Sequence, residues 1–74
     1  MYDDLFLFIK VAQFGSFTKA AKELGIYQST ISRRILSLEE SLGTKLIVRT
    51  ANHFELSLYG QRLYENLIGQ EDLL

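Results

Sequence analysis

The chain has 74 residues and no cysteine; 47% of its residues are hydrophobic, and its formal net charge is −1. This length leaves room for one domain, and a chain so short buries only about 60% of its unfolded surface, so its apolar residues must be used fully in one core. The lack of cysteine excludes disulfide bonds and thiolate metal sites, and the sequence has neither an apolar run that could span a membrane nor a signal peptide, so we expect a cytoplasmic protein.

The charges are unevenly distributed along the chain. Residues 10–53 carry seven basic and three acidic side chains, a net charge of +4, whereas residues 1–9 carry −2 and residues 54–74 carry −3. A basic centre between acidic ends favours a small surface for an anionic partner such as nucleic acid. Chance is the alternative explanation in a chain with so few charges.

The first helix is predicted from about Asp3 to Phe14. Its two leading acidic residues lie where the helix dipole favours negative charge, and Gly15-Ser16 ends it. The spacing i, i+3, i+4 and i+7 predicts its buried face, which is Leu5, Phe8, Ile9 and Ala12.

A second, short helix is predicted from about Thr18 to Leu24. Its small Ala20 and Ala21 allow a neighbouring helix to approach closely. Gly25 stands at the position where a left-handed residue ends a helix at low cost, and Ile26 can then fold back onto the last turn.

The third helix is predicted from about Gln28 to Leu42, with core positions Ile31, Ile35, Leu38 and Leu42. Its first turns carry hydrogen-bonding and basic side chains, which are Gln28, Ser29, Ser32 and Arg33, with Thr30 and Arg34 at the margin. Its last turns carry Glu39 and Glu40, which we expect in solvent. Because the helix dipole favours the opposite order of charges, the basic start indicates a function.

A short helix, a glycine break and a longer helix with a basic start follow the order of a helix-turn-helix, whose second helix meets base edges and phosphates. Glutamine and serine can bond base edges, and arginine can grip guanine bidentately or bridge phosphates. The alternative is an amphipathic helix with an ordinary polar face. The spacing of the two helices and the hairpin that follows them favour DNA binding.

Residues 45–57 are predicted to form a two-stranded hairpin, or wing, from Leu46-Ile47-Val48 and the alternating Phe54-Glu55-Leu56-Ser57. Ser57 is then predicted to cap a fourth helix that runs from about Leu58 to the end. One side of this helix is apolar, through Leu63, Tyr64, Leu67 and Leu74, with Ile68 beside them. Since one small domain cannot cover so much apolar surface, we expect a partner helix.

Catalytic and metal sites find little support in this sequence. The lone histidine, His53, falls in the hairpin, and one imidazole with scattered carboxylates lacks metal-ligand spacing. The carboxylate pairs are adjacent in sequence, so on a helix they point about 100° apart and form no acid–base pair. Tyr59 and Tyr64 could stack on single-stranded nucleic acid, but their place on the apolar stripe favours packing. We therefore expect no enzyme, metal or cofactor.

Many residues match one known pattern in register: Leu5, Phe8, Val11-Ala12, Gly15-Ser16-Phe17-Thr18, Ala20-Ala21, Leu24, Gln28, Ile31-Ser32-Arg33, Ile35, Leu38-Glu39, Leu42-Gly43, Lys45-Leu46, Arg49-Thr50, Leu56-Ser57 and Gly60. Over nearly the whole chain, this pattern resembles the N-terminal winged helix-turn-helix of bacterial LysR-type transcriptional regulators. The resemblance implies a mainly α fold with a three-helix core, a two-stranded wing and a C-terminal linker helix. It divides the chain into a DNA-binding domain, residues 1–57, and a linker or dimerisation helix, residues 58–74.

The resemblance also implies a role for each matched position. Base contacts in the major groove would come from Gln28, Ser29, Ser32 and Arg33. Backbone and minor-groove contacts would come from Thr18 and Lys19 near a phosphate strand, Arg49 at the base of the wing, and Asn52 and His53 at its tip. A homodimer would form through Leu63, Tyr64, Leu67 and Ile68. The expected partners are double-stranded DNA and a second copy of the chain, with no membrane or small-molecule ligand.

The chain departs from the family pattern in three ways. Tyr27 stands where a capping serine is usual, Ser29 replaces a proline, and Asn52-His53 replaces an arginine at the wing tip. The large effector-binding domain of the family is also absent, so we expect an excised domain or a truncated relative. A different function is then open: a dimerisation module that pairs with a full-length regulator.

Overall fold

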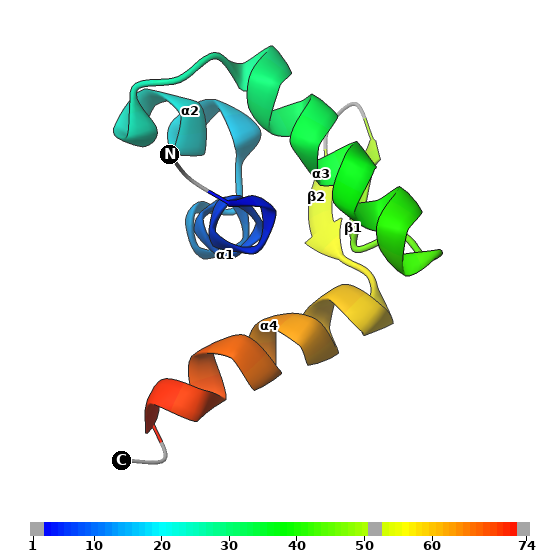
Figure 1. The fold of residues 1–74 in the computed structure, drawn as a ribbon. Coiled ribbons are helices and arrows are strands. Elements are labelled where there is room, and N and C mark those ends of the chain that lie inside the picture. Colours follow the sequence, from blue (N-terminus) through cyan, green and yellow to red (C-terminus); the bar gives the residue numbers. More distant parts are fainter. Residues whose placement is uncertain (1–2, 51–52, 73–74) are drawn as a thin grey trace.

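The computed structural model describes the backbone of residues 3–50 and 53–72, and the side chains of these residues except at positions 50, 53 and 70–72. The elements in chain order are α1 (Asp4–Phe14), α2 (Phe17–Leu24), α3 (Gln28–Leu42), β1 (Ile47–Thr50), β2 (His53–Leu56) and α4 (Leu58–Asp72). The first three helices contact one another, the hairpin stands beside α3, and α4 crosses below against α1 and β2 (Figure 1). The predicted order of helices and strands is confirmed.

Helix α1 begins at Asp4, one residue later than predicted, because Asp3 caps it: the Asp3 carboxylate accepts a hydrogen bond of 2.7 Å from the Phe6 backbone N–H. The prediction of its buried face is wrong, because the helix is rotated about its axis relative to the predicted orientation. The fully buried residues are Leu7, Phe8 and Val11, whereas Leu5 is exposed and Ile9 and Ala12 are half-buried. Nearly every position of α1 is apolar, so spacing alone left its rotation open, and contacts with α2, α3 and α4 select the face.

Helix α2 begins one residue earlier than predicted, at Phe17, because the Ser16 hydroxyl accepts a hydrogen bond from the Lys19 N–H and caps the helix. Gly25 adopts a left-handed conformation with φ of 70°. The next residue, Ile26, donates its N–H to the Ala21 carbonyl at 3.1 Å and packs against the core. The predicted return of the chain onto α2 is therefore confirmed.

Helix α3 has the predicted limits, but its last turns differ from the prediction. Ile31 and Ile35 are buried, whereas Leu42, predicted in the core, is 50% exposed. Glu39, predicted in solvent, is buried, and its Oε2 accepts hydrogen bonds from the N–H groups of Leu46 (2.7 Å) and Ile47 (3.1 Å). The chain returns alongside α3 after Gly43, and its buried N–H groups need an acceptor there.

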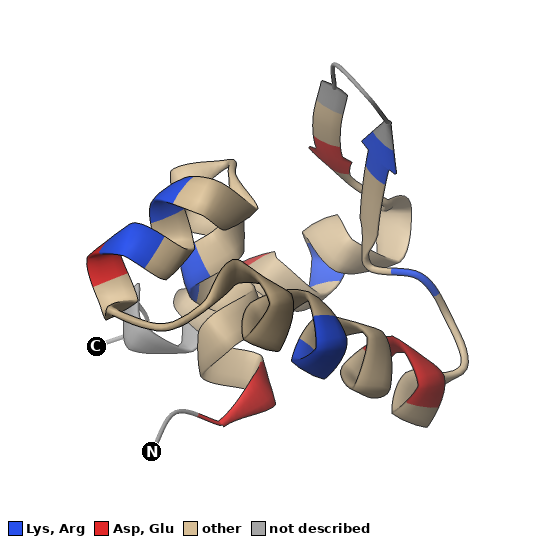
Figure 2. Cartoon of the chain, turned by 90° about the horizontal axis from the view of Figure 1, so that it is seen from above, with Lys and Arg blue, Asp and Glu red and all other residues tan. Residues whose placement is uncertain are grey.

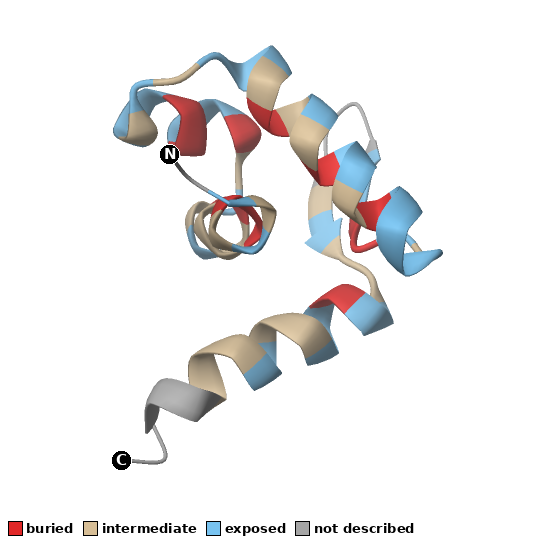
Figure 3. Ribbon diagram, in the orientation of Figure 1, coloured by how far each residue is buried: buried red, intermediate tan, exposed pale blue. Residues whose placement is uncertain are grey.

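The hairpin is antiparallel and pairs Ile47 with Leu56. Leu46 and Ile47 join the buried residues of the three helices, which face one another across a single core (Figure 3). The predicted cap of α4 is confirmed, since the Ser57 hydroxyl accepts from the Gly60 N–H at 3.0 Å and donates to the Lys45 carbonyl at 2.6 Å. Within the described residues, no helix has the length and apolar character needed to cross a membrane.

Candidate nucleic-acid interface

The starts of α2 and α3 lie side by side, although they are far apart in the sequence. The Thr18 hydroxyl, on the second residue of α2, donates a hydrogen bond of 3.2 Å to Oε1 of Gln28, the first residue of α3. Both residues are exposed. The fold therefore joins a predicted phosphate contact directly to a predicted base contact.

The predicted base-contacting residues share one outward face of α3. Gln28, Ser29 and Arg33 are exposed and Ser32 is half-buried. Positions four residues apart lie on the same side of a helix, so this face also includes Leu36, which is 56% exposed. Leu36 was not among the predicted residues, although its offset of four from Ser32 was the signal in the sequence that could have found it.

The two marginal residues of α3 lie elsewhere. Arg34 is on another flank, where its Nε lies 2.7 Å from an Asp4 carboxylate oxygen in a partly buried ion pair. This contact ties α3 to the start of α1 and does not support the predicted DNA contact of Arg34. Thr30 is half-buried and donates its backbone N–H to the Tyr27 carbonyl.

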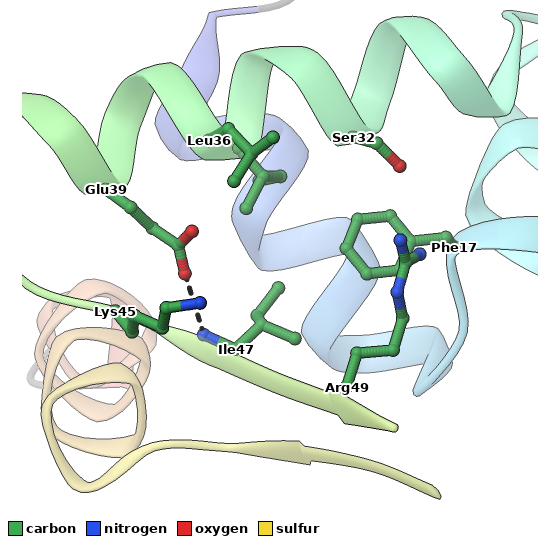
Figure 4. A pocket seen from close by; sticks show the side chains of 8 residues that line it. Phe17, Ser32, Leu36, Glu39, Lys45, Ile47 and Arg49 are labelled. Atoms are coloured by element: carbon green, nitrogen blue, oxygen red, sulfur yellow. Dashed lines mark hydrogen bonds between the residues drawn. The ribbon is translucent and has the colours of Figure 1, made fainter. Parts of the chain in front are cut away.

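A pocket of about 210 Å³ separates α3 from the wing. Its lining residues are Phe17, Ser32, Ile35, Leu36, Glu39, Lys45, Ile47 and Arg49. The Arg49 guanidinium lies over the Phe17 ring at 4.3 Å from its centroid, and Phe17 packs edge-on against Phe54 at 5.8 Å. Ser32 from α3 and Arg49 from β1 both point into the space between the two elements (Figure 4). The two packed rings therefore hold the Arg49 guanidinium between the wing and the outward face of α3.

The family model of bacterial regulatory helix-turn-helix proteins of the lysR family matches residues 2–61. The chain belongs to the LysR family. This is a family of regulators and not of enzymes. Among the described residues, no group of three or more His, Cys, Asp or Glu side chains could hold a metal ion.

Relatives of this LysR-family chain include a probable transcriptional regulator of Klebsiella pneumoniae, LtrA, which is 38% identical over 85% of the chain and 20% of the relative. The full-length structure of AphB, a virulence activator of Vibrio cholerae, is similar with a TM-score of 0.87 and 38% sequence identity. The match covers 93% of this chain and 24% of AphB. The chain thus spans about a fifth of the length of its curated relatives.

The chain is also similar to the BenM DNA-binding domain solved in complex with the catB site 1 DNA, with a TM-score of 0.82 and 36% identity. This match covers 95% of the chain and 82% of the BenM domain. The predicted fold, a mainly α winged helix-turn-helix, is therefore confirmed. The likeness extends from the three-helix core through the wing into α4.

Helix α4 of this LysR-family chain turns much of its apolar stripe towards the rest of the domain. Leu63, Tyr64 and Leu67 are half-buried against the core, and Ile68 is half-buried as well. Tyr59, expected to pack, is 63% exposed. The predicted residues Asn52 and Leu74, and the side chain of His53, lie outside the described part of the chain.

Proposed function

We propose that this domain binds double-stranded DNA in a sequence-specific manner, as the DNA-binding part of a bacterial transcriptional regulator, with the start of α3 in the major groove. One observation carries the proposal: the side chains of α3 that can bond base edges share one outward face beside the start of α2. The likeness to the BenM domain solved on DNA supports it. Such a regulator works in the cytoplasm, where bacterial DNA lies.

The base contacts come from Gln28, Ser29, Ser32 and Arg33. Arginine can bind guanine O6 and N7 bidentately, and the shorter polar side chains select among the remaining edges. Thr30, at the margin of this face, is a further candidate for a contact near the groove.

The phosphate contacts come from the flanks of this face. Thr18 and Lys19 lie in the first turn of α2, where backbone N–H groups and the helix dipole favour an anion. Arg49, held over the Phe17 ring, lies across the pocket from Ser32. Its guanidinium is placed to bind the phosphates of a DNA strand that passes between α3 and the wing. Asn52 and His53 are proposed along the minor groove on the family resemblance alone.

The distribution of charge supports this assignment. Basic residues lie on α2, on the first half of α3 and on β1, where Arg49 pairs with Phe54 towards the tip of the wing and not at its base, whereas the acidic residues of α3 lie at its far end (Figure 2). Glu39 is buried and bonded to backbone N–H groups, so its carboxylate is withdrawn from the outward face. The modest net charge of the chain therefore conceals a basic DNA-facing side.

We also propose that two copies pair through α4, using the parts of Leu63, Tyr64, Leu67 and Ile68 that their own domain leaves uncovered. Two paired domains would present two copies of α3 to the half-sites of an interrupted palindrome. The exposed Leu58 and Tyr59 enlarge the apolar surface that a second copy can cover.

Selection of bound sequences from a random duplex pool tests both proposals at once. We expect one enriched half-site sequence, repeated as a palindrome. On that duplex, Arg33→Ala and Gln28→Ala should each cost about 1–3 kcal/mol and relax base preference. Arg62→Ala is the matched control, since Arg62 is exposed but lies on α4.

Equal binding by the parent and by both α3 variants would contradict the placement of α3 in the groove. If no duplex is enriched but the chain binds a full-length LysR-type regulator, the interaction module is the better function.

A further inference from the structure

We propose that Leu36 contacts the C5 methyl group of a thymine in the major groove, and that Leu36 is therefore a further residue that selects the DNA sequence. The inference rests on the proposed function, because it requires the outward face of α3 to lie in the groove. It adds one apolar base contact to the proposed polar ones, further along the same helix.

Leu36 is a large apolar side chain that the fold leaves in solvent. It is 56% exposed, whereas the neighbouring Ile35 is 2% exposed and belongs to the core. The core therefore closes without most of the Leu36 side chain, whose methyl groups gain free energy when another apolar group covers them. A single exposed leucine is common on protein surfaces, so the role of Leu36 follows from its position on α3.

The position of Leu36 places it on the face of α3 that is proposed to enter the groove. It lies four residues after Ser32 and seven after Ser29, about one and two helical turns along the same side. Each turn rises by about 5.4 Å, so Leu36 reaches further along the groove than Ser32. One turn beyond Leu36 stands Glu40, which is exposed and would repel phosphate. Leu36 is therefore the last residue of this face that suits DNA.

The pocket between α3 and the wing brings Leu36 beside the proposed path of a DNA strand. Leu36 and Ser32 line this pocket from α3, and Arg49 lines it from β1, over the Phe17 ring (Figure 4). A strand whose phosphate binds Arg49 would therefore pass beside the two α3 side chains.

The chemistry of the major groove identifies thymine as the base that suits a leucine. Thymine is the base that presents a methyl group there, whereas the edges of adenine, guanine and cytosine present hydrogen-bond donors and acceptors. A leucine cannot bond these groups, and a polar group that is covered without a partner costs free energy. Leu36 would thus favour thymine and disfavour the other bases at one base pair.

The experiment removes the methyl group from the DNA and the leucine from the protein. In the duplex selected from the random pool, each thymine is replaced in turn by deoxyuridine, which keeps the hydrogen-bonding atoms of thymine and lacks its methyl group. Dissociation constants are measured for the parent, Leu36→Ala and Leu36→Met. Leu42→Ala is the matched control, because Leu42 is also a leucine of α3, is 50% exposed and points about 120° away from Leu36.

We expect one thymine whose replacement weakens binding of the parent by about fourfold, the factor that corresponds to one buried methyl group. Leu36→Ala should bind the thymine and deoxyuridine duplexes equally at that position. Leu36→Met should keep part of the difference, and Leu42→Ala should keep all of it. Substitutions at exposed positions usually change stability little, and thermal unfolding verifies that the variants fold.

Three outcomes overturn the inference. If deoxyuridine at every thymine leaves binding of the parent unchanged, no methyl group is contacted, and DNA binding itself stands. If Leu36→Ala keeps the full difference between the two duplexes, another residue contacts the methyl group; an equal loss of affinity for both duplexes then assigns Leu36 to the sugar-phosphate backbone. If the parent enriches no duplex, the proposed function fails together with the inference.

Discussion

The two ends of α3 are held in opposite ways. At its C-terminal end, Gly43 closes the helix in a left-handed conformation, and the buried Glu39 binds the N–H groups that lead into β1. At its N-terminal end, Tyr27 occupies the cap position, makes no side-chain cap and is 82% exposed. The other three helices each begin with a capping side chain, from Asp3, Ser16 or Ser57.

One end of α3 therefore anchors the wing, and the other end is proposed to recognise DNA. The C-terminal end fixes the position of the wing beside α3, so that both would reach one duplex in the proposed complex. The N-terminal end leaves its first N–H groups without a side-chain acceptor, and such groups at a helix start bind phosphate well. The uncapped end is also the one that carries the proposed base contacts.

Removing the anchor should have the largest effect. Glu39→Ala leaves two buried N–H groups without their charged acceptor, and hydrogen bonds to charged groups are worth about 1.5–3 kcal/mol each. We expect the free energy of unfolding, measured in urea, to fall by about 3 kcal/mol or more.

The neighbouring Glu40→Ala is the control, because Glu40 is exposed and surface substitutions usually change stability by less than about 0.5 kcal/mol. Similar losses in the two variants would mean that Glu39 does not anchor the wing.

A second contact at the anchored end can be tested through the glycines of α4. A Cβ added at Gly60 would lie 2.9 Å from the Leu46 carbonyl carbon and closer still to its oxygen, whereas a Cβ at Gly69 meets no atom within 4 Å. Gly60→Ala should therefore destabilise the domain by about 1–3 kcal/mol through overpacking.

Gly69→Ala should instead stabilise the domain, by up to about 1 kcal/mol, through its helix propensity. Thermal unfolding of both variants should give shifts of opposite sign. A neutral Gly60→Ala would show that α4 does not press against Leu46.

The sequence predicted the limits of the elements better than the faces they bury. The caps at Asp3 and Ser57 and the helix end at Gly43 depend on residues within one turn, so local spacing reveals them. The burial of Glu39 depends on N–H groups that lie beyond the helix, after the chain has reversed direction.

In the candidate site too, the sequence predicted features that lie within one helix but not contacts between elements. The polar face of α3 follows from helical spacing, so Gln28 and Arg33 were predicted on it. The ion pair of Arg34 with Asp4 joins residues 30 positions apart, and the bond of Thr18 to Gln28 joins two separate helices. No periodicity within one helix encodes such contacts.

The smallest expected effect lies at the uncapped end. Tyr27→Ser supplies an oxygen that can accept from an N–H of the first turn, and such caps are worth about 1 kcal/mol, or about 4–8 °C in the melting temperature of a domain this small. Tyr27→Ala removes the ring without adding a cap, so the difference between the two variants isolates the cap. If both melt at the same temperature, the first turn of α3 already has its acceptors, and the contrast between the two ends rests on Glu39 alone.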